Sequence, residues 1–190
     1  MDRNTHKLPI ILVCGGSCSG KSSFAKLFAG GLVLSMDHFY YGKSNMKAET
    51  DGSYNFDSPE SVNIVECAEA VEKLAQRQSV EIPVYDMKIS ERVGVQTITV
   101  KPEVSFIVVE GIFSFHSPLR EIATMKIFLD TPTEVRVARR MLRDVEKGRS
   151  DIDTLSWSIV VEKNHAKYIE PMKKYADLAI PFSYNPVKLS

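Results

Sequence analysis

The sequence predicts an α/β fold in which helices flank a parallel sheet of about five strands. Short apolar segments alternate with segments of helical periodicity along the chain. Several apolar segments are uninterrupted, which is typical of parallel strands that are buried on both faces. A glycine-rich turn also joins the first apolar segment to the first predicted helix. These three observations together favour an open α/β sheet over an all-helical or all-β fold.

Length and composition indicate one globular unit. The 190 residues are predicted to form a single domain, residues 1–190, because domains commonly have about 100–200 residues. Hydrophobic residues make up 44% and charged residues 25%, which excludes disordered and fibrous classes. The 24 basic and 24 acidic residues cancel, so neither nucleic acid nor an anionic membrane is expected as a partner.

Two further features lead us to expect a cytoplasmic location. The apolar run near the N-terminus, residues 8–14, is too short to cross a bilayer and has no cleavage site of a secretion signal. The three cysteines, Cys14, Cys18 and Cys67, suggest no disulfide framework, which favours a reducing compartment.

The first half of the chain is predicted from β-branched runs and from capping signals. Gly30 and Gly31 are expected to end the first helix. Ser58, followed by Pro59, has the pattern of a helix N-cap and opens a segment of helical period. A polar, turn-rich excursion is expected between these parts. The predicted elements are strand 9–14, helix 21–29, strand 32–36, surface segment 42–57 and a second helix from Ser58 to Ala75.

The second half is expected to continue the alternation and to add a small lobe. Polar and apolar residues alternate near Gln96, which indicates a β-hairpin lobe over residues 80–100, outside the parallel sheet. The arginine-rich segment 133–150 is predicted to form a lid. The other predicted elements are strands 104–109, 125–129 and 178–181 and helices 133–147 and 152–169.

The strongest functional motif is the glycine-rich turn after the first strand. Its sequence, GGSCSGKS, fits the P-loop pattern G-x-x-x-x-G-K-[ST] and lies between a strand and a helix, as that pattern requires. The backbone N–H groups of such a loop surround phosphate, its lysine contacts the β- and γ-phosphates, and its hydroxyl binds Mg²⁺. The residues predicted to bind ATP are Gly15, Gly16, Ser17, Cys18, Ser19, Gly20, Lys21, Ser22 and Ser23.

Two acidic residues follow predicted strands. Asp37 comes just after the second strand, and Glu110 comes after the apolar run 104–109. Ligands of open α/β sheets bind beyond the carboxyl ends of the strands. Asp37 is therefore a candidate acceptor for the proton of an attacking hydroxyl, and Glu110 is a candidate ligand of Mg²⁺. The alternatives are an aspartate that caps a turn and a glutamate in solvent.

Arginines are concentrated in the predicted helix 133–147. Arg136, Arg140 and Arg143 share one helical face by their i, i+4, i+7 spacing. An arginine can stabilise the charge that develops on a transferred phosphoryl group. The alternative is a solvated basic face on a surface helix.

Nine short blocks, in this order, resemble the uridine–cytidine kinases and together span nearly the whole chain. They are GGSCSGKS at 15–22, MDHFY at 36–40, NFDSP at 55–59, IPVYD at 82–86, VEGI at 109–112, FLDT at 128–131, RRMLRD at 139–144, GR at 148–149 and KKYAD at 173–177. The resemblance implies a P-loop NTPase fold. It also implies transfer of the γ-phosphoryl group of ATP, with Mg²⁺ as cofactor, to the 5′-hydroxyl of uridine or cytidine.

The same resemblance implies roles for individual residues. Asp37 would be the catalytic base beside the catalytic Lys21, and the metal would be bound by Ser22, Asp37 and Glu110. Arg143 and Lys147 would reach the ATP phosphates from the lid. The residues predicted to bind the nucleoside are Phe56, Asp57, Tyr85, Arg140 and Arg149, to which we add Ser90 and Arg92.

The chain departs from the family at the position that would read the base. Ser90 stands where the family has a histidine, five residues after the position of Tyr85. Serine cannot span the same gap, and Arg92 would point the same way if strand alternation persists. We therefore expect uridine and cytidine to be accepted less selectively than in a typical member. Trp157 is expected to pack rather than to stack on a ligand.

Two other functions stay open on the sequence. A related P-loop kinase could phosphorylate another ribosyl or sugar hydroxyl. A nucleotide-dependent switch would bind ATP without turning over a small molecule, but the segment after the second strand and the hairpin lobe favour an acceptor pocket. The expected partners are a nucleoside and ATP, and a homo-oligomer is left open.

Overall fold

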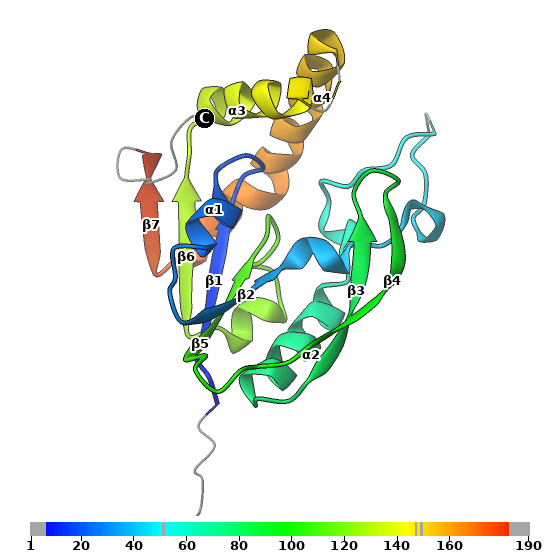
Figure 1. Cartoon of the computed structure of the whole chain (residues 1–190). Coiled ribbons are helices and arrows are strands. Elements are labelled where there is room, and N and C mark those ends of the chain that lie inside the picture. The colour runs from blue at the N-terminus through cyan, green and yellow to red at the C-terminus, as the bar shows by residue number, and fades with distance from the viewer. Residues whose placement is uncertain (1–6, 51, 147, 149, 183–190) are drawn as a thin grey trace, which may run out of the picture.

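A five-stranded parallel sheet forms the centre of the molecule. The computed structural model describes residues 7–50, 52–146, 148 and 150–182. The strand order is β2-β5-β1-β6-β7 (Figure 1), so the predicted α/β fold with five parallel strands is confirmed. The strands are β1 (Ile10–Gly15), β2 (Gly31–Ser35), β5 (Phe106–Glu110), β6 (Met125–Asp130) and β7 (Leu178–Pro181).

Both faces of the central strands β1 and β5 are buried, and successive side chains of each strand point to opposite sides. In β1, Leu12 and Cys14 belong to the core that includes helix α2 (Ile64–Ala75). Val13 lies on the other face and packs in a smaller core with Phe24 of helix α1 (Lys21–Ala25). The uninterrupted apolar strands predicted from the sequence therefore lie between two helical layers.

Helix α1 is shorter than the predicted helix 21–29. Its last residue is Ala25, after which backbone bonds of shorter span, such as Leu27 N–H to the Phe24 carbonyl (3.0 Å), carry the chain into a turn. Leu27 is 61% exposed, so its apolar side chain does not extend the buried face. Gly31 belongs to β2 because it pairs with Phe106, whose ring would lie 2.5 Å from a Cβ at position 31.

Helix α2 begins at Ile64, six residues after the predicted cap. Residues Pro59–Ser61 form only a 3₁₀ turn, and Val62 is extended because it pairs with Tyr40 in a short antiparallel bridge. The cap is Asn63, whose side-chain oxygen accepts a hydrogen bond from the Glu66 N–H (3.1 Å). The predicted N-cap at Ser58 is wrong because a tertiary contact requires the chain to stay extended beyond it.

The predicted hairpin lobe forms a separate sheet. Strands β3 (Val80–Asp86) and β4 (Glu91–Ile98) pair antiparallel, with an irregularity in register between Val84 and Tyr85. Figure 1 shows this hairpin beside α2, away from the parallel sheet. The rings of Tyr85 and Tyr40 lie 5.5 Å apart, which joins the hairpin to the segment after β2.

Two helices extend beyond the end of the sheet (Figure 1). They are α3 (Thr133–Glu146) and α4 (Asp151–Asn164), close to the predicted ranges, and α4 continues into a π-helical turn at His165–Ile169. In the described residues, no helix is long and apolar enough to span a membrane.

Candidate active site

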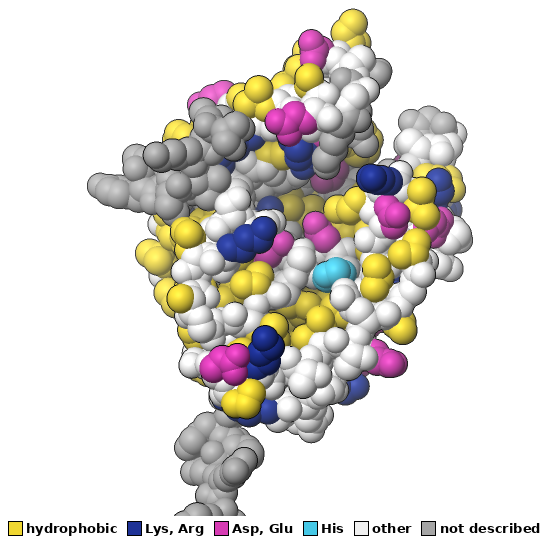
Figure 2. Space-filling view, viewed as in Figure 1, with side chains coloured by type: hydrophobic (Ala, Val, Ile, Leu, Met, Phe, Trp, Pro, Cys, Tyr) yellow, Lys and Arg dark blue, Asp and Glu magenta, His cyan; other side chains and the backbone are white. Residues whose placement is uncertain are grey.

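The carboxyl ends of three parallel strands open into one cavity of about 320 Å³. This volume lies at the lower end of the ~300–1,000 Å³ typical of small-molecule sites. Figure 2 shows acidic and basic side chains around a hollow between the two outer helices and the hairpin. The described residues that line the cavity are Ser17, Cys18, Lys21, Ser22, Asp37, Tyr40, Phe56, Asp57, Tyr85, Met87, Ser90, Glu110, Ile112, Arg140, Arg143, Asp144 and Trp157.

The P-loop forms one end of this cavity. Lys21 is buried, and its ammonium group donates to the Gly16 carbonyl (2.9 Å). Gly20 has a φ of 99°, a conformation that favours glycine, and it immediately precedes α1. A Cβ on Gly16 would lie 2.6 Å from the Arg136 guanidinium, so this position also needs a glycine. Gly15, Ser19 and Ser23 belong to the same loop and helix start but do not line the cavity in the described structure.

Hydroxyl and carboxylate oxygens converge beside the P-loop. Glu110, at the end of β5, accepts hydrogen bonds from the hydroxyls of Ser22 (3.1 Å) and Ser35 (2.8 Å). The Ser35 hydroxyl in turn accepts from the Asp37 N–H (3.3 Å) and so fixes the start of the turn that carries Asp37. Glu110 is buried although it is acidic.

This donor set fits a magnesium ion. Mg²⁺ prefers oxygen ligands and is usually held by one or two carboxylates together with substrate phosphates and water. The structure offers the Ser22 hydroxyl and the carboxylates of Glu110 and Asp37 beside the phosphate-binding loop. Among the described residues, no three His, Cys, Asp or Glu side chains gather as a self-sufficient metal cluster. The arrangement therefore suits an ion that arrives with a phosphate ligand.

Asp37 has an unusual environment for a carboxyl group. Burial is the main cause that raises its pKa from 3.8 to about 6, and the nearby Glu110 carboxylate adds to the increase. The positive charges of Lys21 and Arg143 oppose the shift without cancelling it. A carboxyl group with a pKa near neutrality is suited to accept a proton from a substrate hydroxyl.

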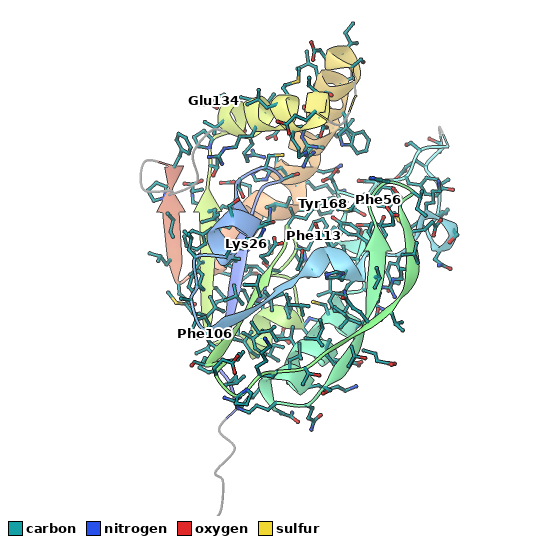
Figure 3. All side chains as sticks on the ribbon, viewed as in Figure 1. Lys26, Phe56, Phe106, Phe113, Glu134 and Tyr168 are labelled. Atoms are coloured by element: carbon teal, nitrogen blue, oxygen red, sulfur yellow. The ribbon has the colours of Figure 1, made fainter. Side chains whose placement is uncertain are left out.

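Aromatic and acidic residues line a second part of the cavity, which we call its aromatic end. Phe56, which Figure 3 shows near the carboxyl end of β3, packs edge-on against Tyr40 with ring centroids 6.2 Å apart. Burial raises the pKa of Asp57, and the Arg140 guanidinium opposes that shift. Burial also raises the pKa of Tyr85, while a hydrogen bond from Ser90 opposes the rise. This end thus offers apolar rings, a carboxylate acceptor and two hydroxyl groups.

The arginines of α3 take different positions. Arg140 and Arg143 line the cavity, and Arg143 donates from Nε to the buried Asp144 carboxylate (2.8 Å). Arg136 is 2% exposed and forms a bidentate ion pair with Glu162 of α4, with the shorter distance 2.6 Å. The helical spacing placed the three side chains on one face, but the docking of α4 covers the Arg136 end of that face.

Arg92 lies away from the cavity. Its guanidinium donates to the Tyr40 and Phe39 carbonyls (2.8 and 3.0 Å) and pairs with Glu66 of α2. Ser90 precedes β4 and has a φ of 57°, so the strand alternation on which the expectation for Arg92 rested does not begin until after Ser90. The expectation that Arg92 shares the direction of Ser90 is therefore wrong. Lys147 and Arg149 lie outside the described residues.

Several lining residues were not predicted as site residues. Tyr40 stands within the block MDHFY, so the sequence signal was present. Ile112, Met87 and Asp144 lie within two residues of predicted positions. Trp157 carries no motif, and the sequence predicted packing for it, yet its side chain lines the cavity.

Comparison with known proteins agrees with this geometry. The uridine kinase of Bacillus pumilus is 37% identical over 184 residues, which cover 91% of this chain and 86% of that protein. Uridine kinase-like protein 3 of Arabidopsis thaliana is 36% identical over 191 residues, but the chain spans only 41% of its length. The phosphoribulokinase of Rhodobacter spheroides has the same fold, with a TM-score of 0.67 at 17% identity, over 93% of this chain and 70% of that one.

The family comparison covers the site as well as the sheet. The model of the phosphoribulokinase / uridine kinase family matches residues 10–186, from β1 through the last strand. The matched range includes the P-loop, Asp37, Glu110 and the helices that line the cavity. The fold is thus that of the P-loop kinases, and the chain belongs to the phosphoribulokinase / uridine kinase family.

Proposed function

We propose that this chain transfers the γ-phosphoryl group of ATP to the 5′-hydroxyl of uridine or cytidine, giving UMP or CMP. The observation that carries the proposal is one cavity that is lined both by a phosphate-binding loop and by aromatic and acidic residues suited to an acceptor. Asp37, after β2, lines the same cavity. The names of the bacterial relatives support the choice of nucleoside.

Asp37 is the proposed base. The hydroxyl proton passes to its carboxylate, the nucleoside oxygen forms a bond to the γ-phosphorus, and the bond from that phosphorus to the bridging oxygen breaks to release ADP. A pKa raised to about 6 leaves most Asp37 side chains ionised at neutral pH while keeping them basic enough to accept a proton. Lys21 and Arg143, whose charges act on Asp37, would stabilise negative charge on the transferred group.

The nucleoside is proposed to bind at the aromatic end. An ionised carboxylate is a pure acceptor of hydrogen bonds, so Asp57 suits the two ribose hydroxyls. The Arg140 guanidinium opposes the rise in the pKa of Asp57 that burial causes, and so favours the charged carboxylate. Phe56 and Tyr85 would flank the sugar and base, and Ser90 would face the base edge. Arg149 and Lys147 keep the roles that the resemblance implied for them as predictions.

Ser22, Glu110 and Asp37 would hold Mg²⁺, which supplies charge neutralisation of the ATP phosphates when it is bound. We also propose that the described elements form one catalytic domain that acts on free nucleosides in the cytoplasm, in the salvage of pyrimidines. The balanced charge of the chain supports small molecules rather than nucleic acid as partners.

A nucleoside panel tests the proposal. ADP release is measured with ATP and Mg²⁺ and with uridine, cytidine, adenosine, guanosine, ribose or ribulose 5-phosphate as acceptor, and the product is identified by mass. We expect ADP release to be fastest with uridine or cytidine, slower with the purine nucleosides and absent with ribose or ribulose 5-phosphate. Phosphorylation of a sugar acceptor alone would instead show a related sugar kinase. Acceptor-independent hydrolysis would show a nucleotide-dependent switch.

The Lys21→Ala variant provides the matched control. This substitution removes the lysine ammonium group that would contact the β- and γ-phosphates of ATP, so turnover should fall by at least a hundredfold. Lys21 bonds within the protein only to the Gly16 carbonyl among the described contacts, so the fold should persist. Turnover at the wild-type rate in a normally folded Lys21→Ala protein would contradict the assignment of the P-loop as the ATP site.

A further inference from the structure

We infer that Trp157 forms the wall of the nucleoside site that limits the size of the base, so that pyrimidine nucleosides fit and purine nucleosides do not. This inference rests on the proposed function and adds a specificity-determining residue to it. The family blocks do not include Trp157, and the sequence predicted ordinary packing for it. The evidence is that Trp157 lines both the reaction cavity and a neighbouring one, and that its helix is bonded to the segment that carries Asp57.

Trp157 faces inward from α4. Its neighbours Thr154, Ser158 and Val161 are buried, whereas Leu155 and Ile159 are 53% and 70% exposed. Trp157 itself is partly exposed and lines the cavity. Thr154 and Ser158, on the buried face of the helix, have small side chains. Trp157 is the largest side chain on this face of α4.

Trp157 also lines a second, more open depression of about 680 Å³. It is bounded by the segment 53–55 and by α4 residues such as Val160 and Asn164. Among the described residues, Trp157 is the one that lines both this cavity and the reaction cavity. Trp157 is therefore the side chain that the two spaces share, and its truncation would enlarge the reaction cavity beside α4.

Hydrogen bonds fix the position of Trp157 relative to the turn at residues 55–57, which is proposed to bind the ribose. Asn164, two turns after Trp157 on the same helix, donates from its amide to the Asn55 side-chain oxygen (3.2 Å). The same Asn55 oxygen accepts from the Asp57 N–H (3.1 Å). The turn that carries Phe56 and Asp57 is thus tied to α4, so the position of Trp157 is set relative to a ribose held by Asp57.

The chemistry of the wall suits a nucleobase. An indole offers a large apolar face on which any base can stack, and such stacking discriminates by size and overlap rather than by hydrogen bonds. Ser90 offers only a short hydroxyl at the base edge, so it gives little discrimination between uridine and cytidine. Steric exclusion by Trp157 would select against the larger purine bases, even though Ser90 is too short to read the base edge by a direct hydrogen bond.

Intrinsic fluorescence gives a direct test, because Trp157 is the single tryptophan of the chain. Uridine is titrated into the Lys21→Ala protein without ATP, so that no turnover occurs. A saturable change in emission intensity or wavelength is expected with uridine and cytidine. An emission unaffected by saturating uridine, bound as judged by calorimetry, would overturn the inference.

Three variants test the size limit. Trp157→Ala should raise the KM for uridine roughly tenfold, since a stacked base loses its aromatic partner. It should leave the KM for ATP unchanged and should increase the ratio of kcat/KM for adenosine to that for uridine at least tenfold. Trp157→Phe should keep the pyrimidine KM within a few-fold of wild type. Leu155→Ala, on the exposed side of the same helix, is the matched control and should change neither value.

The outcomes separate the two claims. A wild-type enzyme that phosphorylates pyrimidine nucleosides, with an unchanged purine ratio in Trp157→Ala, would overturn the size wall and leave the proposed function standing. Failure of the wild-type protein to phosphorylate any nucleoside would overturn the proposed function instead.

Discussion

Asp37 occupies an environment that opposes its charge. Its side chain is partly buried near Glu110, and desolvation together with the Glu110 charge raises its pKa from 3.8 to about 6. The folded protein therefore binds a proton at Asp37 more tightly than the unfolded chain does. Below about pH 4 the carboxyl group is protonated in both states and does not change the free energy of unfolding. As the pH rises through about 6, this side chain lowers the free energy of unfolding by an increasing amount. The same burial that costs stability gives the carboxylate its basicity.

Asp37→Asn should therefore separate stability from activity. At pH 8 in metal-free buffer the variant should unfold with a free energy higher by up to about 3 kcal/mol, from roughly two pKa units at 1.36 kcal/mol each. At pH 4 the gain should vanish. The kcat should fall by roughly 10²–10⁴-fold with the loss of the base. Denaturant unfolding at both pH values and steady-state kinetics measure the two effects.

The control for this prediction is Glu69→Gln, an exposed carboxyl group on α2. It should alter neither unfolding nor turnover. A variant of Asp37 that is equally or less stable than wild type at pH 8, or that keeps most of its kcat, would contradict the role of Asp37.

Ser90 combines a strained backbone with a short side chain. Its φ is 57°, and its hydroxyl bonds to Tyr85 at the base end of the cavity. Histidine is among the residues enriched at positive φ, so Ser90→His should fold. The longer side chain can donate to or accept from the base edge. The value of kcat/KM for uridine and cytidine should rise about fivefold, the worth of one additional hydrogen bond of about 1 kcal/mol.

Ser90→Gly is the matched control, since it relieves the positive φ and removes the hydroxyl. It should stabilise the fold slightly without the gain in kcat/KM. A lower kcat/KM for pyrimidine nucleosides in Ser90→His would show that the serine itself reads the base.

At the level of elements, the start of α2 shows how a tertiary contact moves a helix boundary. Ser58 and Pro59 have the local signature of a helix start, yet the helix begins at Ile64. The bridge between Val62 and Tyr40 holds the intervening chain extended. The hydroxyl of Ser61, which is buried, instead bonds to the Ser58 and Phe56 carbonyls (2.6 and 2.9 Å) and shapes the turn next to Asp57.

The two candidate caps can be compared by mutation. Asn63→Ala should lower the free energy of unfolding by about 1 kcal/mol, the usual value of an N-cap. Ser58→Ala should lower it by less, because the Ser58 side chain makes no cap bond. Thermal and denaturant unfolding of both variants provides the measurement. An equal or larger loss in Ser58→Ala would place the functional cap at Ser58.

For the whole molecule, a buried ion pair connects the two outer helices to the P-loop. Arg136 of α3 bonds to Glu162 of α4, and its Nε donates to the Thr131 carbonyl (3.0 Å). The Thr131 hydroxyl donates to the Ser19 carbonyl in the P-loop (3.1 Å). The Arg136 guanidinium also lies 2.6 Å from the position that a Cβ of Gly16 would take. Arg136 therefore packs directly against the P-loop and stabilises its conformation. The geometry of ATP binding thus depends on helices far along the chain.

Arg136→Ala should therefore affect both stability and ATP binding. The loss of one partner of a fully buried ion pair typically costs about 3–5 kcal/mol, and the cost here should be smaller because Glu162 is 23% exposed. The KM for ATP should rise more than the KM for uridine, because the P-loop loses its support. Arg136→Lys should recover only part of either effect, since lysine lacks the bidentate fork. Glu134→Ala, at an exposed position of the same helix (Figure 3), should change neither the stability nor the KM for ATP. Equal increases in the KM for ATP and the KM for uridine in Arg136→Ala would contradict the role of Arg136 at the P-loop.

The sequence by itself determined the parts of this protein whose chemistry is local. A glycine-rich loop between a strand and a helix can be recognised because backbone conformation and the lysine lie in one short segment. Asp37 and Glu110 were predictable because parallel strands all end at one edge of the sheet. The number of parallel strands followed from the uninterrupted apolar runs, whereas their order in the sheet came only from the tertiary structure.

Only the tertiary structure decided the parts that depend on distant packing. Equal helical spacing could not show that Arg136 is buried while Arg140 and Arg143 line the cavity, because the position of α4 decides it. Arg92 is held by carbonyls and by Glu66 of another element, and no local pattern encodes that contact. Trp157 lines the cavity for the same reason. The direction of a side chain depends on local backbone structure, but its contact partners come from distant segments that approach one another only on folding.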